Sequence, residues 1–251
     1  MKTKFLTINK RKIAYSLSIN ALNPSDPVIV FLGGFMSNMD GTKALFLDKF
    51  CKKNKLNFLR FDYSGHGKSS GSFKDFCISD WKNDTLGVIN SLINGPVVLI
   101  GSSMGGWISL IISKYLKNIV GMICIAAAPD FTKDKIWKGF TKAQKKEIKS
   151  NGFVELPSSY PDSPYLITHK LIIDGEKNLI GDKLIKLEFP VRLLQGTSDK
   201  EVDLSTALKL LKNIRCDDID LTLVKNADHQ FSNFRSLEKI KDKVKEILRF
   251  N

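Results

Sequence analysis

The pentapeptide Gly101-Ser102-Ser103-Met104-Gly105 constrains this chain more than any other feature. It follows the apolar run VVLI and precedes MGGWISLIISKYL, which reads as a buried helix. A G-x-S-x-G between a strand and a helix is typical of a nucleophile elbow, a tight turn that exposes a serine at the edge of a sheet. Glycines two residues to either side remove side chains that would clash there. The pattern therefore predicts Ser103 as a nucleophile and disfavours Ser102, which has no glycine two residues before it.

Short apolar runs alternate with amphipathic segments along most of the chain. We expect strands at 5–9, 12–18, 28–32, 57–63, 97–101, 120–127, 191–196 and 220–225. We expect helices at 41–54, 80–93, 104–116, 203–213 and 234–249. Several strands are apolar throughout, as burial on both faces of a parallel sheet requires. This alternation predicts an α/β fold of three layers, with a mostly parallel eight-stranded sheet flanked by helices.

The segment 131–188 breaks the alternation. It begins with the lysine-rich KDKIWKGFTKAQKKEIKS, which predicts helix, continues through the turn-like LPSSYPDSPY, and ends in YLITHKLIIDG, which predicts a second short helix. Such a length is unusual for an ordinary loop. We therefore expect a first core part at 1–130, an inserted helical lid at 131–188 and a second core part at 189–251. The lid should lie over the carboxyl ends of the strands.

A nucleophilic serine needs a base and an acid that orients the base. His229 is the expected base, because it lies in the loop NADHQFS after a strand, whereas His66 belongs to a glycine turn and His169 to the lid. Asp199, directly after the strand VRLLQG, is the expected acid. The chain order Ser, Asp, His is the one that accompanies this type of elbow. Three other carboxylates remain open as the acid: Glu201, Asp203 and Asp228.

The oxyanion formed by attack on a carbonyl group needs two backbone N–H donors. Met104, the residue after the serine, is expected to supply one. Phe35, in the glycine-containing loop 33–36 after the strand VIVFL, is expected to supply the other. Nearby apolar side chains are compatible with an acyl pocket and equally with ordinary core packing. They are Phe35, Met36, Met39, Met104 and Trp107.

Composition argues against several other classes of function. The net charge is +13, but the lysines are scattered and lack interleaved aromatic residues, so we expect no nucleic-acid partner. Four isolated cysteines and three separated histidines predict reduced thiols and no metal site. No apolar run reaches the length of a membrane span, so stable membrane insertion is not expected. The basic amino terminus has no apolar core of a signal peptide and no obvious transit peptide, which predicts a cytoplasmic location.

The sequence resembles the α/β-hydrolase superfamily over nearly its whole length. The matching motifs are GGFM at the oxyanion position, DYSGHGKS at 62–69, GSSMGG at the elbow, QGTSD for the acid and DH for the base. More narrowly, FMSNMDGTKALFLDKFCK, RFDYSGHGKSSG and GSSMGGW resemble the branch of alpha/beta hydrolase domain-containing protein 10. That resemblance implies palmitoyl-protein thioesterase or acyl-glucuronide esterase activity, with Ser103, Asp199 and His229 as the triad. Gly33 departs from the family, because many members have a histidine there.

We therefore expect a serine hydrolase that cleaves carboxylic esters or thioesters through an acyl-enzyme on Ser103, without a cofactor. The expected partner is a small-molecule ester or thioester, or an acylated protein. The basic helix from Lys133 to Lys149 predicts a preference for anionic substrates. The same constellation also serves carbon–carbon or amide cleavage and acyl transfer. Outside catalysis, the alternative is a silent hydrolase-fold protein that binds acidic lipid or protein surfaces.

Overall fold

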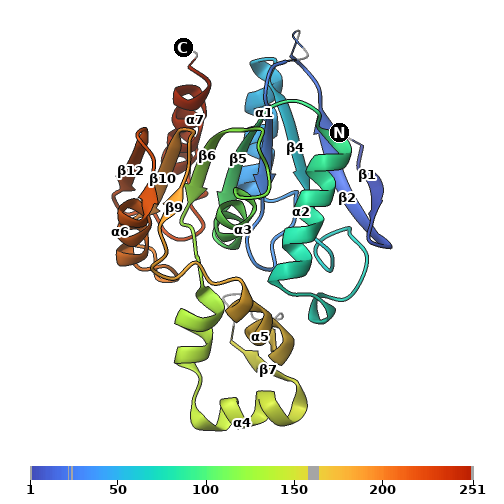
Figure 1. Cartoon of the computed structure of the whole chain (residues 1–251), viewed down its shortest axis with the longest axis vertical. Helices are drawn as coiled ribbons and strands as arrows, with labels where there is room; N and C mark the ends of the chain where they lie inside the picture. The colour runs from blue at the N-terminus through green and yellow to red at the C-terminus, as the bar shows by residue number, and fades with distance from the viewer. Residues whose placement is uncertain (1, 22, 24, 158–163, 250–251) are drawn as a thin grey trace.

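The computed structural model describes residues 2–21, 23, 25–157 and 164–249. Its principal sheet contains eight strands: β1 Lys4–Ile8, β2 Arg11–Ser18, β3 Val28–Leu32, β4 Asn57–Phe61, β5 Val97–Ser102, β6 Ile119–Ile125, β10 Val191–Gly196 and β12 Ile219–Val224. Their order across the sheet is β1-β2-β4-β3-β5-β6-β10-β12 (Figure 1). Strand β2 pairs antiparallel with both β1 and β4, and all other neighbours are parallel. The predicted mostly parallel sheet of eight strands is confirmed.

Alternation along the central strands divides the core into two halves. In β5, Val97 and Leu99 pack on one face, whereas Val98 and Ile100 pack on the other. Successive strand residues point to opposite faces, so an apolar strand must be covered on both sides. Helices α2, α3 and α6 cover the first face, and α1 and α7 cover the second. Their bounds are α1 Thr42–Lys53, α2 Ile78–Leu92, α3 Met104–Ile112, α6 Leu204–Asn213 and α7 Phe234–Leu248.

The segment between β6 and β10 projects beyond the sheet as a separate layer (Figure 1). Its elements are the π-helical turn η2 Thr132–Trp137, α4 Lys142–Asn151, β7 Phe153–Leu156, β8 Tyr165–Thr168 and α5 His169–Lys177. Before β10 the segment ends in the short strand β9 Ile185–Lys186, which pairs with β11 Ile214–Arg215, and the 3-10 helix η1 Phe73–Asp75 precedes α2. The middle of the predicted turn region, at 158–163, lies outside the described residues.

Two helix predictions in this segment need correction. The lysine-rich stretch is not one helix, because the Thr141 side chain accepts a hydrogen bond from the Gln144 amide (3.2 Å) and so starts a new helix there. The stretch beginning at Tyr165 opens as strand β8, which pairs antiparallel with β7. Its helix begins only at His169, where the Thr168 hydroxyl accepts from the Leu171 amide (3.1 Å). The β7–β8 hairpin itself was not predicted.

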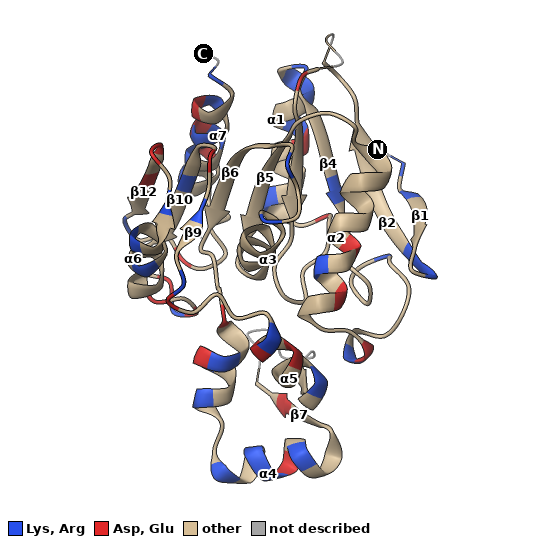
Figure 2. Cartoon of the chain, viewed as in Figure 1, with Lys and Arg blue, Asp and Glu red and all other residues tan. Residues whose placement is uncertain are grey.

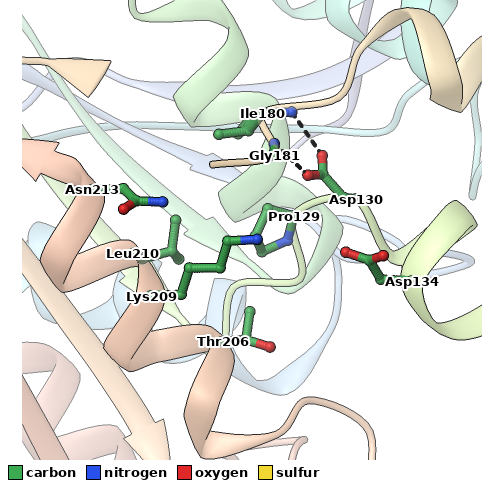
Figure 3. Close-up of a pocket in the computed structure, with 9 residues that line it drawn as sticks. All are labelled: Pro129, Asp130, Asp134, Ile180, Gly181, Thr206, Lys209, Leu210 and Asn213. Atoms are coloured by element: carbon green, nitrogen blue, oxygen red, sulfur yellow. Dashed lines mark hydrogen bonds between the residues drawn. The ribbon is translucent and has the colours of Figure 1, made fainter. Parts of the chain in front are cut away.

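One carboxylate ties together the two chain crossings between the sheet and this segment. Asp130, buried just after β6, accepts hydrogen bonds from the amides of Ile180 (2.8 Å) and Gly181 (2.6 Å), where the chain returns (Figure 3). Residues of α6 line the small cavity beside this neck. The beginning and the end of the segment are therefore fastened to each other beside α6.

Other sequence-based expectations concern metals, thiols and membranes. Cys51, Cys77 and Cys124 are buried, Cys216 is partly exposed, and all four are free of disulfides. Burial raises the pKa of Cys124 to about 12, which keeps this thiol neutral. Within the described ranges, no group of three or more His, Cys, Asp or Glu side chains is placed to hold a metal ion. Nor is any described helix long and apolar enough to cross a membrane.

Candidate active site

Ser103 lies at the turn between β5 and α3, with φ 53° and ψ −117°. This conformation is unfavourable for a residue with a side chain and persists only where the surroundings enforce it. A Cβ at Gly101 would lie 2.4 Å from the Gly105 carbonyl oxygen, and one at Gly105 would lie 2.1 Å from the Leu32 carbonyl oxygen. The backbones therefore meet too closely for any other residue. Ser102 ends strand β5 and is buried.

Three side chains that are far apart in the sequence form one hydrogen-bonded chain. Nε2 of His229 lies 3.0 Å from Oγ of Ser103, and Nδ1 of His229 lies 2.9 Å from Oδ2 of Asp199. A carboxylate can only accept, so Nδ1 carries the hydrogen and Nε2 is left to accept the serine proton. The imidazole is partly exposed, which leaves the site open to solvent. The structure thus brings together the three residues expected to be nucleophile, base and acid.

The environment of Asp199 keeps it ionised. Its side chain is fully buried, which alone would raise the pKa of the carboxyl group. Hydrogen bonds from His229 and from the amides of Val202 (2.9 Å) and Glu201 (2.8 Å) outweigh that effect and bring the pKa below its usual value. The side chain of Gln195 donates a further hydrogen bond to Oδ2 (3.0 Å). Asp199 is therefore held in position from several directions.

The three rival carboxylates have other roles. Oε2 of Glu201 pairs with Nζ of Lys135 from the inserted segment (2.7 Å). Asp203 occupies the N-cap position of α6. Oδ1 of Asp228 accepts a hydrogen bond from the Phe231 amide (3.0 Å). The contact of Asp199 with His229 therefore favours Asp199 over all three.

The loop after β3 passes directly beside Ser103. A Cβ placed on Gly34 would lie 3.4 Å from Cβ of Ser103. Met104 begins α3, where the first amides of a helix have no partner within the helix. Among the described residues, the amides of Phe35 and Met104 donate no hydrogen bond to another part of the protein. Met104 thus follows the serine in the chain, Phe35 follows the glycine that packs against it, and both expected donors are left available to an incoming oxygen.

An aromatic layer connects this loop to the inserted segment. The Phe35 ring meets the Phe131 ring edge to face, with centroids 5.3 Å apart, and Phe131 meets Trp107 at 5.6 Å. The Tyr165 ring, from β8, lies 6.2 Å from Phe35. Of the other apolar residues considered for an acyl pocket, Met39 and Met104 are buried, and Met36 is exposed. The inserted segment therefore contacts the loop that borders the serine.

His66 is the residue at this site that sequence reasoning missed. Its sequence context predicts only a glycine turn, yet its Nε2 accepts a hydrogen bond from the Met36 amide (3.2 Å), in the loop beside Ser103. The available signal was the spacing of the motif DYSGHGKS, which holds the chain in a fixed turn. The motif does not disclose which distant loop the turn contacts.

Comparison with known proteins places the chain in a family. The model of the "Alpha/beta hydrolase family" matches residues 29–238, which is most of the chain. The chain belongs to the alpha/beta hydrolase family. A Bos taurus protein of this kind, named palmitoyl-protein thioesterase ABHD10, mitochondrial, is 34% identical over 218 residues, which cover 86% of this chain and 71% of the relative.

Two solved structures are similar over almost their full length. A putative hydrolase from Agrobacterium vitis S4 is 35% identical with a TM-score of 0.94, and the match covers 98% of both chains. Alpha/beta hydrolase domain-containing protein 10 from mouse is 29% identical with a TM-score of 0.88, and the match covers 99% of both chains. The expected α/β-hydrolase fold and the resemblance to the narrower branch are both confirmed, and the chain is an enzyme of this family.

The same relatives overturn one expectation. The cytoplasmic location inferred from the amino terminus is wrong by this comparison, because five curated ABHD10 relatives are mitochondrial by name. These alpha/beta hydrolases point to the mitochondrion and not to the cytoplasm. The lack of an obvious transit-peptide pattern in the first residues was therefore an unsound basis for that inference.

Proposed function

We propose that this chain is a serine hydrolase that cleaves acyl thioesters and esters through a covalent acyl-enzyme on Ser103. The hydrogen-bonded chain from Ser103 through His229 to Asp199 carries the proposal. It offers a nucleophile, a base and an orienting acid in the relative positions that acyl transfer needs. The relatives' name, palmitoyl-protein thioesterase, favours a long acyl chain on a thiol leaving group, either of a small molecule or of an acylated protein.

The reaction follows from the positions of these groups. Oγ of Ser103 attacks the acyl carbonyl carbon while its proton passes to Nε2 of His229, and ionised Asp199 stabilises the imidazolium. The amides of Phe35 and Met104 face the oxyanion. The tetrahedral intermediate then collapses, and the leaving thiol or alcohol takes the proton from His229. Water, deprotonated by the same histidine, attacks the acyl-enzyme and releases the carboxylic acid.

The inserted segment 131–188 is the proposed lid, between core parts 1–130 and 189–251. Contacts of Phe131 and Tyr165 with Phe35 support this role, because they put apolar rings from the segment over the loop that borders Ser103. An acyl chain that entered beneath these rings would leave water and bury its methylene groups. The neck at Asp130 would keep the lid attached to the core during such an exchange.

A series of p-nitrophenyl esters and acyl-CoA thioesters, from acetyl to palmitoyl, tests the proposal. We expect kcat/KM to rise by about fourfold per added methylene until the pocket is full, since each buried methylene contributes about 0.8 kcal/mol. A plateau or maximum then gives the length of the pocket. A folded protein that hydrolyses no member of either series would contradict the proposal and favour the carbon–carbon or amide alternative.

The lysines of the proposed lid lead to a second prediction. We expect their positive charge to attract anionic substrates towards the lid. Lys142, Lys146 and Lys149 are exposed on α4, at the far end of the segment (Figure 2). Because α4 lies far from the sheet, we expect these lysines to attract an anionic substrate at long range and not to contact its reacting group. We expect kcat/KM for an acyl-CoA to fall about three- to tenfold between about 10 mM and about 300 mM salt. A neutral p-nitrophenyl ester of the same acyl chain is the control.

Replacing all three lysines with glutamine should remove most of this salt dependence for the acyl-CoA and leave the neutral ester unchanged. If kcat/KM for the acyl-CoA changes neither with salt nor with the substitutions, the lid lysines do not attract the anionic substrate. That result would leave the proposed serine chemistry intact, because that chemistry does not depend on the lid lysines.

A further inference from the structure

The turn at 62–69 is fastened to the loop that carries the Phe35 amide. Three of its side chains contact three different residues of that loop. The contacts are Tyr63 Oη to the Gly33 carbonyl oxygen (3.3 Å), the Met36 amide to His66 Nε2 (3.2 Å), and the Met39 amide to Asp62 Oδ1 (2.6 Å). They lie on both sides of Phe35 along the chain. The turn therefore determines how the loop passes Ser103.

Of these three side chains, His66 is the one that contacts Met36, the residue next to Phe35 in the sequence. The surroundings of the imidazole determine which of its nitrogens carries the hydrogen. Its Nδ1 lies 3.2 Å from the Ser64 carbonyl oxygen, which can only accept a hydrogen bond. Nδ1 must therefore carry the hydrogen, and Nε2 presents a lone pair to the Met36 amide. Burial lowers the pKa of His66 to about 4, so the ring stays neutral near pH 7 and keeps that lone pair.

The imidazole has little freedom to turn away. It is 4% exposed, and it packs edge to face against Tyr63, Phe73 and Trp81, with ring centroids 5.1 to 5.5 Å apart. Rotation of the ring would break both hydrogen bonds and these ring contacts together. The acceptor at Nε2 is therefore a rigid point in the structure.

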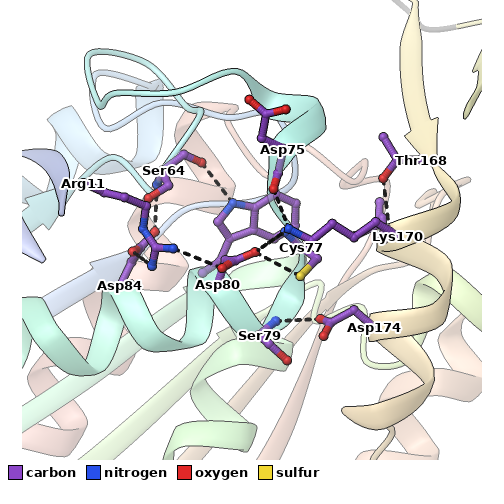
Figure 4. Close-up of polar contacts among 12 residues, drawn as sticks. Arg11, Ser64, Asp75, Cys77, Ser79, Asp80, Asp84, Thr168, Lys170 and Asp174 are labelled. Atoms are coloured by element: carbon purple, nitrogen blue, oxygen red, sulfur yellow. Dashed lines mark hydrogen bonds and ion pairs between the residues drawn. The ribbon is translucent and has the colours of Figure 1, made fainter. Parts of the chain in front are cut away.

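Ser64, which orients His66, is itself anchored to helix α2. Its amide donates to Oδ2 of Asp84 (2.8 Å), and Asp84 pairs with Arg11 (2.7 Å), as Figure 4 shows. Its carbonyl oxygen also accepts from Nε1 of Trp81 (3.0 Å). A continuous set of hydrogen bonds thus leads from the core helix, through Ser64 and His66, to the loop beside the nucleophile.

Met36 needs such an anchor. Its φ is 56°, a conformation that residues with side chains rarely adopt, and its side chain is 39% exposed. Packing of that side chain therefore contributes little to holding the backbone. The hydrogen bond from its amide to His66 opposes relaxation of the strained residue, which would turn the adjoining Phe35 peptide.

We propose that His66 is a positioning residue for the oxyanion hole, whose Nε2 holds the Met36 amide and so keeps the Phe35 amide directed at the oxyanion. This inference rests on the proposed function, because it takes Phe35 as one of the two donors. His66 contacts no substrate. Its loss should therefore weaken stabilisation of the transition state while leaving ground-state binding of the acyl chain unchanged.

Steady-state hydrolysis of a p-nitrophenyl ester by His66→Phe and His66→Gln tests the proposal. Phenylalanine keeps the ring volume but has no acceptor, whereas glutamine keeps a carbonyl oxygen of similar reach. We expect His66→Phe to lower kcat about 10- to 100-fold with KM within about twofold, which is less than the loss of a whole oxyanion donor. His66→Gln should recover most of that loss. His169→Phe, the same exchange on α5, is the matched control and should behave as wild type.

A transition-state analogue separates positioning from a general loss of structure. An acyl trifluoromethyl ketone, which adds to Ser103 and forms an oxyanion, should bind His66→Phe more weakly by the same factor as kcat falls. The fatty-acid product should bind both proteins equally. If His66→Phe does not fold, His66→Asn, which is too short to reach the Met36 amide, takes its place in the comparison.

Three results would overturn the proposal: an unchanged kcat in His66→Phe, an equal loss in His66→Gln, or an equal weakening of analogue and product binding. Failure of the proposed function is distinguishable from these outcomes. It would appear as a wild-type protein without hydrolytic activity, or as a Ser103→Ala protein as active as wild type.

Discussion

Substitution of Ser103 by alanine is expected to lower kcat for thioester and ester hydrolysis by at least about ten-thousandfold. The Ser103 hydroxyl oxygen lies 3.0 Å from Nε2 of His229 and is the proposed nucleophile. Its removal therefore eliminates the acyl-enzyme route. Alanine keeps the Cβ and the backbone at φ 53°. Kinetics and labelling by a fluorophosphonate measure the loss, and an unchanged melting temperature shows that the fold is retained.

Ser102→Ala is the matched control for this prediction. Ser102 is adjacent in sequence but lies buried at the end of β5 and takes no part in the hydrogen bonds that join Ser103, His229 and Asp199. We expect its kcat to remain within about threefold of wild type and its fluorophosphonate labelling to persist. Loss of labelling in Ser102→Ala together with retention in Ser103→Ala would reverse the assignment of the nucleophile.

Substitution of Asp199 by asparagine is expected to lower kcat by about a thousand- to ten-thousandfold. The amide group of asparagine would face Nδ1 of His229 and force the other tautomer, in which Nε2 carries the hydrogen and cannot accept the serine proton. The amides of Glu201 and Val202 would still find an acceptor in the asparagine oxygen, so the loop should keep its shape. Hydrolysis rates and the melting temperature of the purified variant check both statements.

Asp203→Asn is the control for the choice of acid. Asp203 is an exposed N-cap residue of α6 whose side chain makes no capping hydrogen bond. Its replacement should leave kcat within about twofold of wild type. If Asp203→Asn were inactive while Asp199→Asn retained full activity, the arrangement of acid and base proposed for this site would be wrong.

Much of the fold could be predicted because the relevant patterns are local. The apolar strand residues Val97 to Ile100 require two covering layers, and α1, α7 on one side and α2, α3, α6 on the other supply them. Gly101 and Gly105 could be recognised for the same reason. Their spacing reflects a close approach of backbones around Ser103, which no larger residue allows.

Predictions in the inserted segment were less accurate because pairing there is not local. The run Tyr165–Thr168 reads as part of a helix when taken alone. It pairs, however, with Phe153–Leu156, which lies earlier in the chain and is separated from it by intervening residues. Only the Thr168 cap, which depends on the Leu171 amide, gives a local signal for where the helix begins. Strand pairing at such a separation depends on how the intervening chain closes, which periodicity does not report.

By itself, the sequence determined the alternation of strands and helices, the elbow at Ser103 and a short set of candidate acids and bases. Only the tertiary structure decided that Asp199, and not Glu201, Asp203 or Asp228, meets His229, and that His66 contacts the loop beside Ser103. The physical reason is the range of the interactions. Helix and turn signals depend on neighbours a few residues apart, whereas a hydrogen bond between distant loops exists only after the sheet has brought them to the same edge.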